Sequence, residues 1–215
     1  MKKYGKMIIS IFALIIIIGG SAIVYNKLSA EYRPNSLSQV GENDSGDQMG
    51  ESKNTSEASD ENQSQEPSGE DPEQVPAPDF TVENALGEEV MLSDFVGKPI
   101  VLNFWASWCG PCKNEMPDFQ TVYETYGEDV VFLMVNLTDN SRETKETAMA
   151  YIEEEQYTFP VYFDVEQEAA YAYYVTSVPA TYFIDTEGYV AAYGKGSLDQ
   201  DTILEGLEMM GVTTK

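Results

Sequence analysis

Residues 100–113 read Ile-Val-Leu-Asn-Phe-Trp-Ala-Ser-Trp-Cys-Gly-Pro-Cys-Lys, and this stretch decides the fold. Its apolar first half predicts a buried strand, and Lys113 to about Tyr126 is typical of a helix. Cys109 and Cys112 are the two cysteines of the 215-residue chain. A Cys-x-x-Cys pair where a helix follows a strand favours a redox dithiol, because unpaired N–H groups and the helix dipole stabilise a thiolate there.

Other uses of two cysteines fit the chain less well. A disulfide across two residues closes too short a loop to stabilise a fold much. A structural zinc ion needs about four Cys or His ligands, whereas this chain has two cysteines and no histidine. A copper site that combines the cysteines with methionine ligands fits the chain only slightly better than the zinc site does. We therefore expect no metal and no cofactor.

The composition restricts the partners. The formal net charge is −25, so we expect no nucleic-acid binding and repulsion from anionic lipid surfaces. From Pro76 onward, 25 acidic residues accompany 6 basic ones. We interpret this excess as a solvated acidic surface rather than as a site for one basic partner.

The chain divides into three segments. Residues 1–30 hold an apolar run, Met7–Val24, preceded by three lysines, which predicts a cytoplasmic stub and a transmembrane anchor. A cleaved signal peptide is the rival interpretation. Residues 31–75 are polar and acidic, and predict a disordered tether. Residues 76–215 are expected to form one domain in an extracytoplasmic compartment.

The domain alternates strand-like and helix-like stretches. Phe80–Asn84 and Leu86–Leu92 predict a hairpin, followed by the strand Ile100–Phe104, the motif and its helix. Strands are expected at 130–135, 161–163, 180–184 and 189–193, and helices at 141–156, 166–174 and 198–210, with Ser141 as a helix cap. This order predicts an α/β fold with a central mixed sheet flanked by helices and an N-terminal hairpin extension.

Three landmarks together resemble the thioredoxin superfamily. They are the Phe104–Lys113 segment, Pro117 five residues after Cys112, and Val178-Pro179-Ala180-Thr181, which is similar to the cis-proline loop. Within the superfamily the chain resembles the membrane-anchored TlpA/ResA group, in which Cys-Lys-x-Glu-x-Pro continues the motif and Asn often stands where Asn103 does. The Gly-Pro spacer departs from the Glu-Pro spacer of ResA.

The resemblance implies roles for individual residues. By its position at the helix start, Cys109 is the expected attacking sulfur, and Cys112 resolves the mixed disulfide. Glu115 is a candidate proton carrier for Cys112, the alternative being an exposed residue that favours the helix dipole.

Docking of a substrate chain is expected at five residues of this region. The cis-proline loop would pair its Val178 backbone with the substrate strand. The expected substrate-binding residues are Trp108, Gly110, Pro111, Val178 and Pro179.

These features predict a monomeric thiol–disulfide oxidoreductase that reduces protein disulfides. In family terms, electrons would come from a membrane thiol transporter of the CcdA or DsbD type. Substrates would be apocytochromes c or proteins such as methionine sulfoxide reductases. The alternatives are an oxidase or isomerase of exported proteins, a peroxiredoxin-class peroxidase and a Sco-like metal carrier.

Overall fold

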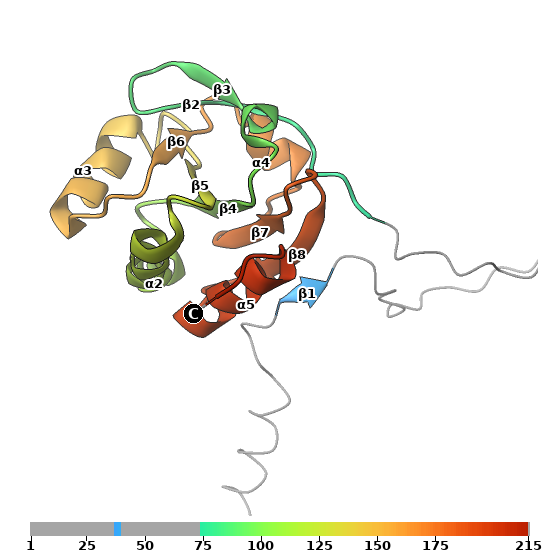
Figure 1. Cartoon of the computed structure of the whole chain (residues 1–215). Helices are drawn as coiled ribbons and strands as arrows, with labels where there is room; N and C mark the ends of the chain where they lie inside the picture. Colours follow the sequence, from blue (N-terminus) through green and yellow to red (C-terminus); the bar gives the residue numbers. More distant parts are fainter. Residues whose placement is uncertain (1–36, 40–73, 215) are drawn as a thin grey trace, which may run out of the picture. The chain divides into compact units, whose positions relative to one another are not determined.

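A computed structural model of the chain describes residues 37–39 and 74–214 (Figure 1). No helix within these residues is both long and apolar enough to cross a bilayer. The predicted anchor and most of the predicted tether lie outside the described residues.

The described unit is built on an eight-stranded mixed sheet in the order β1-β8-β7-β4-β5-β6-β2-β3. The central strands β4, β5 and β6 run parallel, and β7 and β8 follow on one side as antiparallel strands, with β1 at the edge. The strands are β1 Ser38–Gln39, β2 Thr81–Glu83, β3 Glu89–Met91, β4 Ile100–Trp105, β5 Val131–Asn136, β6 Val161–Phe163, β7 Ala180–Ile184 and β8 Val190–Lys195. The helices are η1 Leu92–Phe95, α2 Gly110–Tyr126, α3 Lys145–Glu155, α4 Glu168–Ala172 and α5 Gln200–Met209. The predicted thioredoxin-like fold with its hairpin extension is confirmed.

Strand β4 supplies both hydrophobic cores, because alternate side chains of a strand point to opposite faces. Val101 and Trp105 face a core shared with α2, α3 and α5. Ile100, Leu102 and Phe104 face the opposite core, which the β2–β3 hairpin, η1 and α4 cover. All six residues of β4 are buried, so the motif that follows starts from a fixed strand end.

Helix α3 begins later than the sequence predicts. Thr144, not Ser141, is its N-cap, and the Thr144 hydroxyl accepts the Thr147 N–H. The expected cap fails because Asp139 Oδ1 already accepts the N–H groups of residues 141, 142 and 143. This side chain holds the preceding residues in a turn rather than a first helical turn.

Part of the segment expected to be disordered joins the sheet. Ser38 and Gln39 pair antiparallel with Tyr193 and Ala192 of β8. Leu37 packs against the core, and a Cβ added to Gly194 would lie 3.1 Å from its Cδ2. The same Cβ would lie 2.9 Å from Leu198 Cδ2, so glycine at position 194 makes room for both leucine side chains.

Candidate active site

The two cysteines form a disulfide where the chain passes from β4 into α2. Cys109 is the N-cap of α2, and its sulfur lies 3.1 Å from the Cys112 N–H that it caps. Pro111 occupies the first turn, where an N–H would have no partner inside the helix. The same cap would place a Cys109 thiolate against the positive end of the helix dipole.

The disulfide is shielded, with an exposed rim on one side. Cys112 is 0% exposed and Cys109 is 4% exposed, so Cys109 is the residue nearer to solvent, as predicted. Trp108, Gly110 and Pro111 are all exposed beside it. These three predicted substrate-binding residues are therefore neighbours of Cys109 along the chain that lie at the surface.

The loop before β7 lies against the same sulfur. The Val178–Pro179 peptide bond is cis, which confirms the prediction. The Val178 carbonyl oxygen is 3.6 Å from Cys109 Sγ. Pro179, one of the predicted substrate-binding residues, is itself buried, whereas Val178 is half-buried.

Glu115 is fully buried, which excludes its interpretation as an exposed helix residue. It stands three residues after Cys112 on α2, so the two share a helix face. Asn103 Nδ2 donates to its Oε1 at 2.9 Å, and the Leu198 N–H donates to its Oε2 at 3.0 Å. Burial outweighs these bonds and raises the pKa of Glu115 from 4.5 to about 8. Such a group exchanges protons in the range where thiols titrate.

Asn103 connects this carboxyl group to β7. Its Nδ2 also donates to Thr181 Oγ1 at 3.0 Å, whereas its Oδ1 is buried without a hydrogen-bond partner among the described residues. Because an amide can be turned over, Oδ1 can instead face a protonated Glu115 and accept its O–H. Asn103 can therefore form a hydrogen bond with Glu115 in both of its protonation states.

A second buried carboxylate near the motif was not predicted. Glu143 is 0% exposed and accepts the N–H of Ser107 at 2.7 Å and the side chain of Asn136 at 2.7 Å. It lies 34 positions after Cys109 in a polar stretch. The one available signal was Asn136, a polar residue at the end of an otherwise apolar strand beside β4.

The remaining aromatic residues of interest divide between core and surface. Trp105 is 0% exposed and packs in the core, as expected. Tyr173 is also buried, whereas Tyr171 and Tyr174 are exposed. They line a largely apolar hollow beside α4, and no role was predicted for them.

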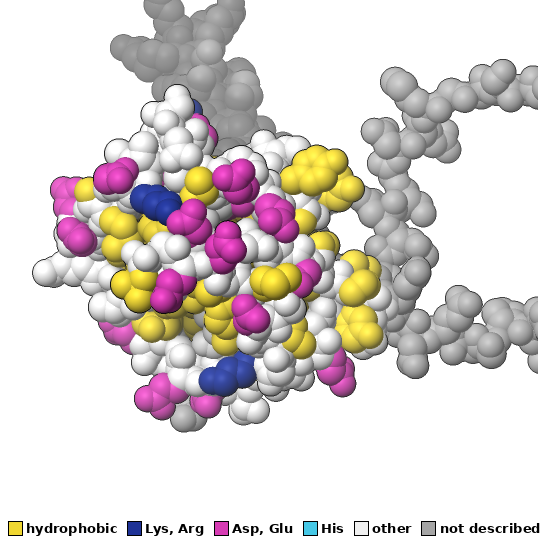
Figure 2. Space-filling model, turned by 90° about the horizontal axis from the view of Figure 1, so that it is seen from above, with side chains coloured by type: hydrophobic (Ala, Val, Ile, Leu, Met, Phe, Trp, Pro, Cys, Tyr) yellow, Lys and Arg dark blue, Asp and Glu magenta, His cyan; other side chains and the backbone are white. Residues whose placement is uncertain are grey.

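Acidic side chains spread among the apolar ones over the face seen in Figure 2, where basic side chains are few.

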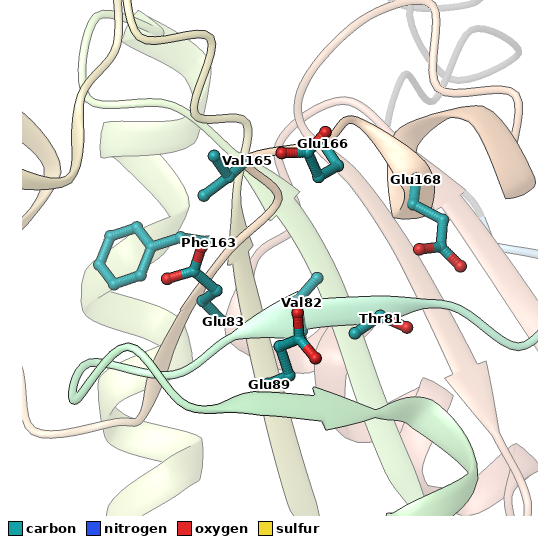
Figure 3. A pocket seen from close by; sticks show the side chains of 8 residues that line it. All are labelled: Thr81, Val82, Glu83, Glu89, Phe163, Val165, Glu166 and Glu168. Atoms are coloured by element: carbon teal, nitrogen blue, oxygen red, sulfur yellow. The ribbon is translucent and has the colours of Figure 1, made fainter.

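A pocket of about 230 Å³ lies beside the β2–β3 hairpin (Figure 3). It is lined by Glu83, Glu89, Glu166 and Glu168 together with Thr81, Val82, Phe163 and Val165. Lys145 pairs with Glu83. None of the lining residues belongs to the motif or to the cis-proline loop. Among the described residues, no group of acidic or cysteine side chains is arranged to hold a metal ion.

Comparisons with known proteins agree with this geometry. A sequence model of the AhpC/TSA family matches residues 74–193. The thiol-disulfide oxidoreductase ResA of Geobacillus kaustophilus is 36% identical over 132 residues, which cover 61% of this chain and 74% of ResA.

Two solved structures share the fold. A putative thiol:disulfide interchange protein DsbE from Chlorobium tepidum matches with a TM-score of 0.57 and 30% identity, covering 64% of this chain and 97% of that one. The exposed lipoprotein thioredoxin Etrx1 of Streptococcus pneumoniae matches with a TM-score of 0.54 and 32% identity, covering 60% and 98%. The chain therefore belongs to the AhpC/TSA family and, within it, to the ResA-like thiol–disulfide oxidoreductases.

Proposed function

We propose that this thiol–disulfide oxidoreductase works as a reductant of protein disulfides, with Cys109 as the attacking sulfur. The observation that carries the assignment of roles is the position of Cys109, which caps α2, lies nearer to solvent and faces the Val178 carbonyl. The Cys109 thiolate attacks one sulfur of the substrate disulfide. The substrate S–S bond breaks, a mixed disulfide forms, and one substrate thiol leaves.

Cys112 completes the exchange. Its sulfur attacks Cys109, closes the Cys109–Cys112 disulfide and releases the second substrate thiol, so two electrons pass to the substrate. Glu115 takes the proton that Cys112 gives up. The structure holds the disulfide form, in which a Glu115 pKa of about 8 keeps this group protonated at neutral pH. When a donor reduces the pair, Glu115 returns that proton to Cys112.

The direction of transfer rests on the Gly-Pro spacer, which is the spacer of reducing thioredoxins. The test is the reduction potential of the full-length protein, equilibrated against glutathione and dithiothreitol buffers. A reductant should lie near the value of about −270 mV known for thioredoxin, whereas a value near the −120 mV or so of DsbA would make the protein an oxidant.

We further propose that the catalytic domain is extracytoplasmic and tethered to the membrane by Met7–Val24. The support is the sequence, with Lys2, Lys3 and Lys6 before the apolar run, and the similarity to Etrx1, which is described as an exposed lipoprotein thioredoxin. Electrons would then come from a membrane thiol transporter of the CcdA or DsbD type. Alkaline carbonate extraction of membranes tests the anchor, because an integral protein stays in the pellet and a cleaved one is released.

A further inference from the structure

The reverse turn that joins β4 to α2 presents the reactive sulfur. The Cys109 N–H donates to the Ala106 carbonyl at 3.1 Å, which closes a four-residue turn over residues 106–109. Ser107 and Trp108 are its two central residues. The direction in which Cys109 faces therefore depends on how Ser107 and Trp108 are held.

Ser107 is held by the side chain of Glu143. The Ser107 N–H donates to Glu143 Oε1 and the Ser107 hydroxyl to Glu143 Oε2, both at 2.7 Å. Asn136 Nδ2 donates to Oε1 at 2.7 Å as well. A carboxylate accepts and does not donate, so it suits a site where three donors converge. Since Glu143 is 0% exposed, water does not compete for these bonds.

Glu143 is itself fixed by a tightly bonded loop, residues 139–143, which we call the clamp loop. Asp139 Oδ1 accepts the N–H groups of Ser141, Arg142 and Glu143, each at 2.8 Å. The Glu143 carbonyl in turn accepts the N–H groups of Asp139 and Asn140. The backbone N–H bonds to the Asp139 side chain lower the pKa of its carboxyl group, so Asp139 stays ionised to a lower pH than an ordinary aspartate.

Trp108 is held by the residue before Glu143. The Arg142 guanidinium lies 3.7 Å from the centre of the Trp108 ring, while 44% of that side chain stays exposed. Within the described residues the structure records one salt bridge, between Lys145 and Glu83, so Arg142 is engaged by the ring and not by a carboxylate. A cation over the face of an indole ring is attracted by the negative face of the ring, so the contact restrains Trp108 even at the surface.

We propose that the clamp loop positions the Ala106–Cys109 turn for catalysis, with Glu143 holding Ser107 and Arg142 holding Trp108. The proposal rests on the proposed function and adds two positioning residues to it. Neither Glu143 nor Arg142 takes part in proton or electron transfer.

The clamp loop acts together with the cis-proline loop. Glu143 fixes the turn from one loop, while the Val178 carbonyl lies 3.6 Å from Cys109 Sγ in the other. A substrate chain that pairs with the Val178 backbone holds its disulfide in one place. The reaction then requires that Cys109 Sγ be aligned with that disulfide. Displacement of a reacting group by about 1 Å can slow a reaction by about a hundredfold. The clamp loop therefore matters for docked substrates and little for reagents that need no docking.

The test compares Glu143→Ala with Glu143→Gln in the reduced full-length protein. The Gln side chain can still accept from Ser107 N–H and Asn136 with its oxygen, and can donate to the Ser107 hydroxyl, so it retains the clamp without the charge. Asp185→Ala is the control, because it too removes a carboxyl group that accepts backbone N–H bonds, but Asp185 lies at the opposite end of β4 from the motif. Two rates are measured, the reduction of insulin disulfides and the alkylation of Cys109 by iodoacetamide.

We expect Glu143→Ala to reduce insulin disulfides roughly 10- to 100-fold more slowly, with alkylation of Cys109 changed by less than about twofold. Glu143→Gln should recover most of the insulin rate, and Asp185→Ala should leave both rates unchanged. Arg142→Ala should slow the insulin reaction to a smaller extent and make the Trp108 fluorescence more accessible to acrylamide quenching.

Two results would overturn the proposal. One is a folded Glu143→Ala protein that reduces insulin at the wild-type rate. The other is a Glu143→Gln protein as slow as Glu143→Ala, which would make the charge and not the position of Ser107 responsible. If the wild-type protein itself fails to reduce insulin while Cys109 alkylates normally, the proposed reductant function fails instead. The Trp108 quenching of the variants then still shows whether the clamp loop holds the turn.

Discussion

Replacement of Glu115 by glutamine should change how the stability of the disulfide form depends on pH. The Gln side chain fits the site, because its oxygen can accept the Leu198 N–H while its amide donates to a turned-over Asn103. The substitution therefore removes the titration and leaves the packing. With the cysteines joined as a disulfide, thiol titration does not contribute to the measurement.

The size and sign of the effect follow from the raised pKa. Burial moves the pKa of Glu115 from 4.5 to about 8, and each pKa unit corresponds to about 1.36 kcal/mol. Between these values the folded protein keeps a proton that the unfolded chain has released. The wild-type free energy of unfolding must therefore fall as pH rises from 4.5 to 8, by roughly 5 kcal/mol in total from this group. The glutamine variant lacks this loss.

Urea denaturation of both oxidised proteins at several values between pH 5 and pH 9 measures the effect. The difference in the free energy of unfolding, wild type minus variant, removes contributions from the other titrating groups. We expect this difference to become more negative by several kcal/mol as pH rises and to level off above pH 8. A difference that stays constant across the range would refute the argument that Glu115 is a buried acid.

Three further changes have defined outcomes. Cys112→Ser in the reduced protein should accumulate a mixed disulfide with the substrate through Cys109, visible on a non-reducing gel, whereas accumulation with Cys109→Ser instead would reverse their roles. Gly206→Ala should lower the free energy of unfolding by about 1–3 kcal/mol, because the added Cβ would overlap the Phe183 ring, and an unchanged urea midpoint would contradict this. Asp199→Ala should cost about 1 kcal/mol through loss of the α5 N-cap; equal stability would show that the cap contributes nothing.

The sequence predicted those parts of the site that are local along the chain. The buried strand, the helix start at Cys109 and the Val178–Pro179 loop all follow from short stretches of residues. Periodicity also placed β7 and the end of α2 correctly. These predictions succeed because strand burial, helix capping and proline geometry are determined by near neighbours.

The parts that were missed depend on contacts between distant residues. Apart from the polar Asn136, nothing in the sequence indicates that Glu143 reaches back to Ser107, 36 positions earlier. The prediction of Ser141 as the N-cap of α3 was wrong because the Asp139 side chain accepts the N–H groups of residues 141, 142 and 143. Glu115 likewise accepts a hydrogen bond from the N–H of Leu198, 83 positions later, which no local pattern indicates.

The pairing of Ser38 and Gln39 with β8 has a consequence for how pieces of this protein behave. A fragment that starts at Pro76 would lack that strand and would leave the outer N–H and C=O groups of β8 unpaired. Unpaired sheet edges recruit other chains, so such a fragment should tend to dimerise or aggregate through β8. A fragment that starts a few residues before Leu37 keeps β1 paired with β8 and is the better choice for solution work.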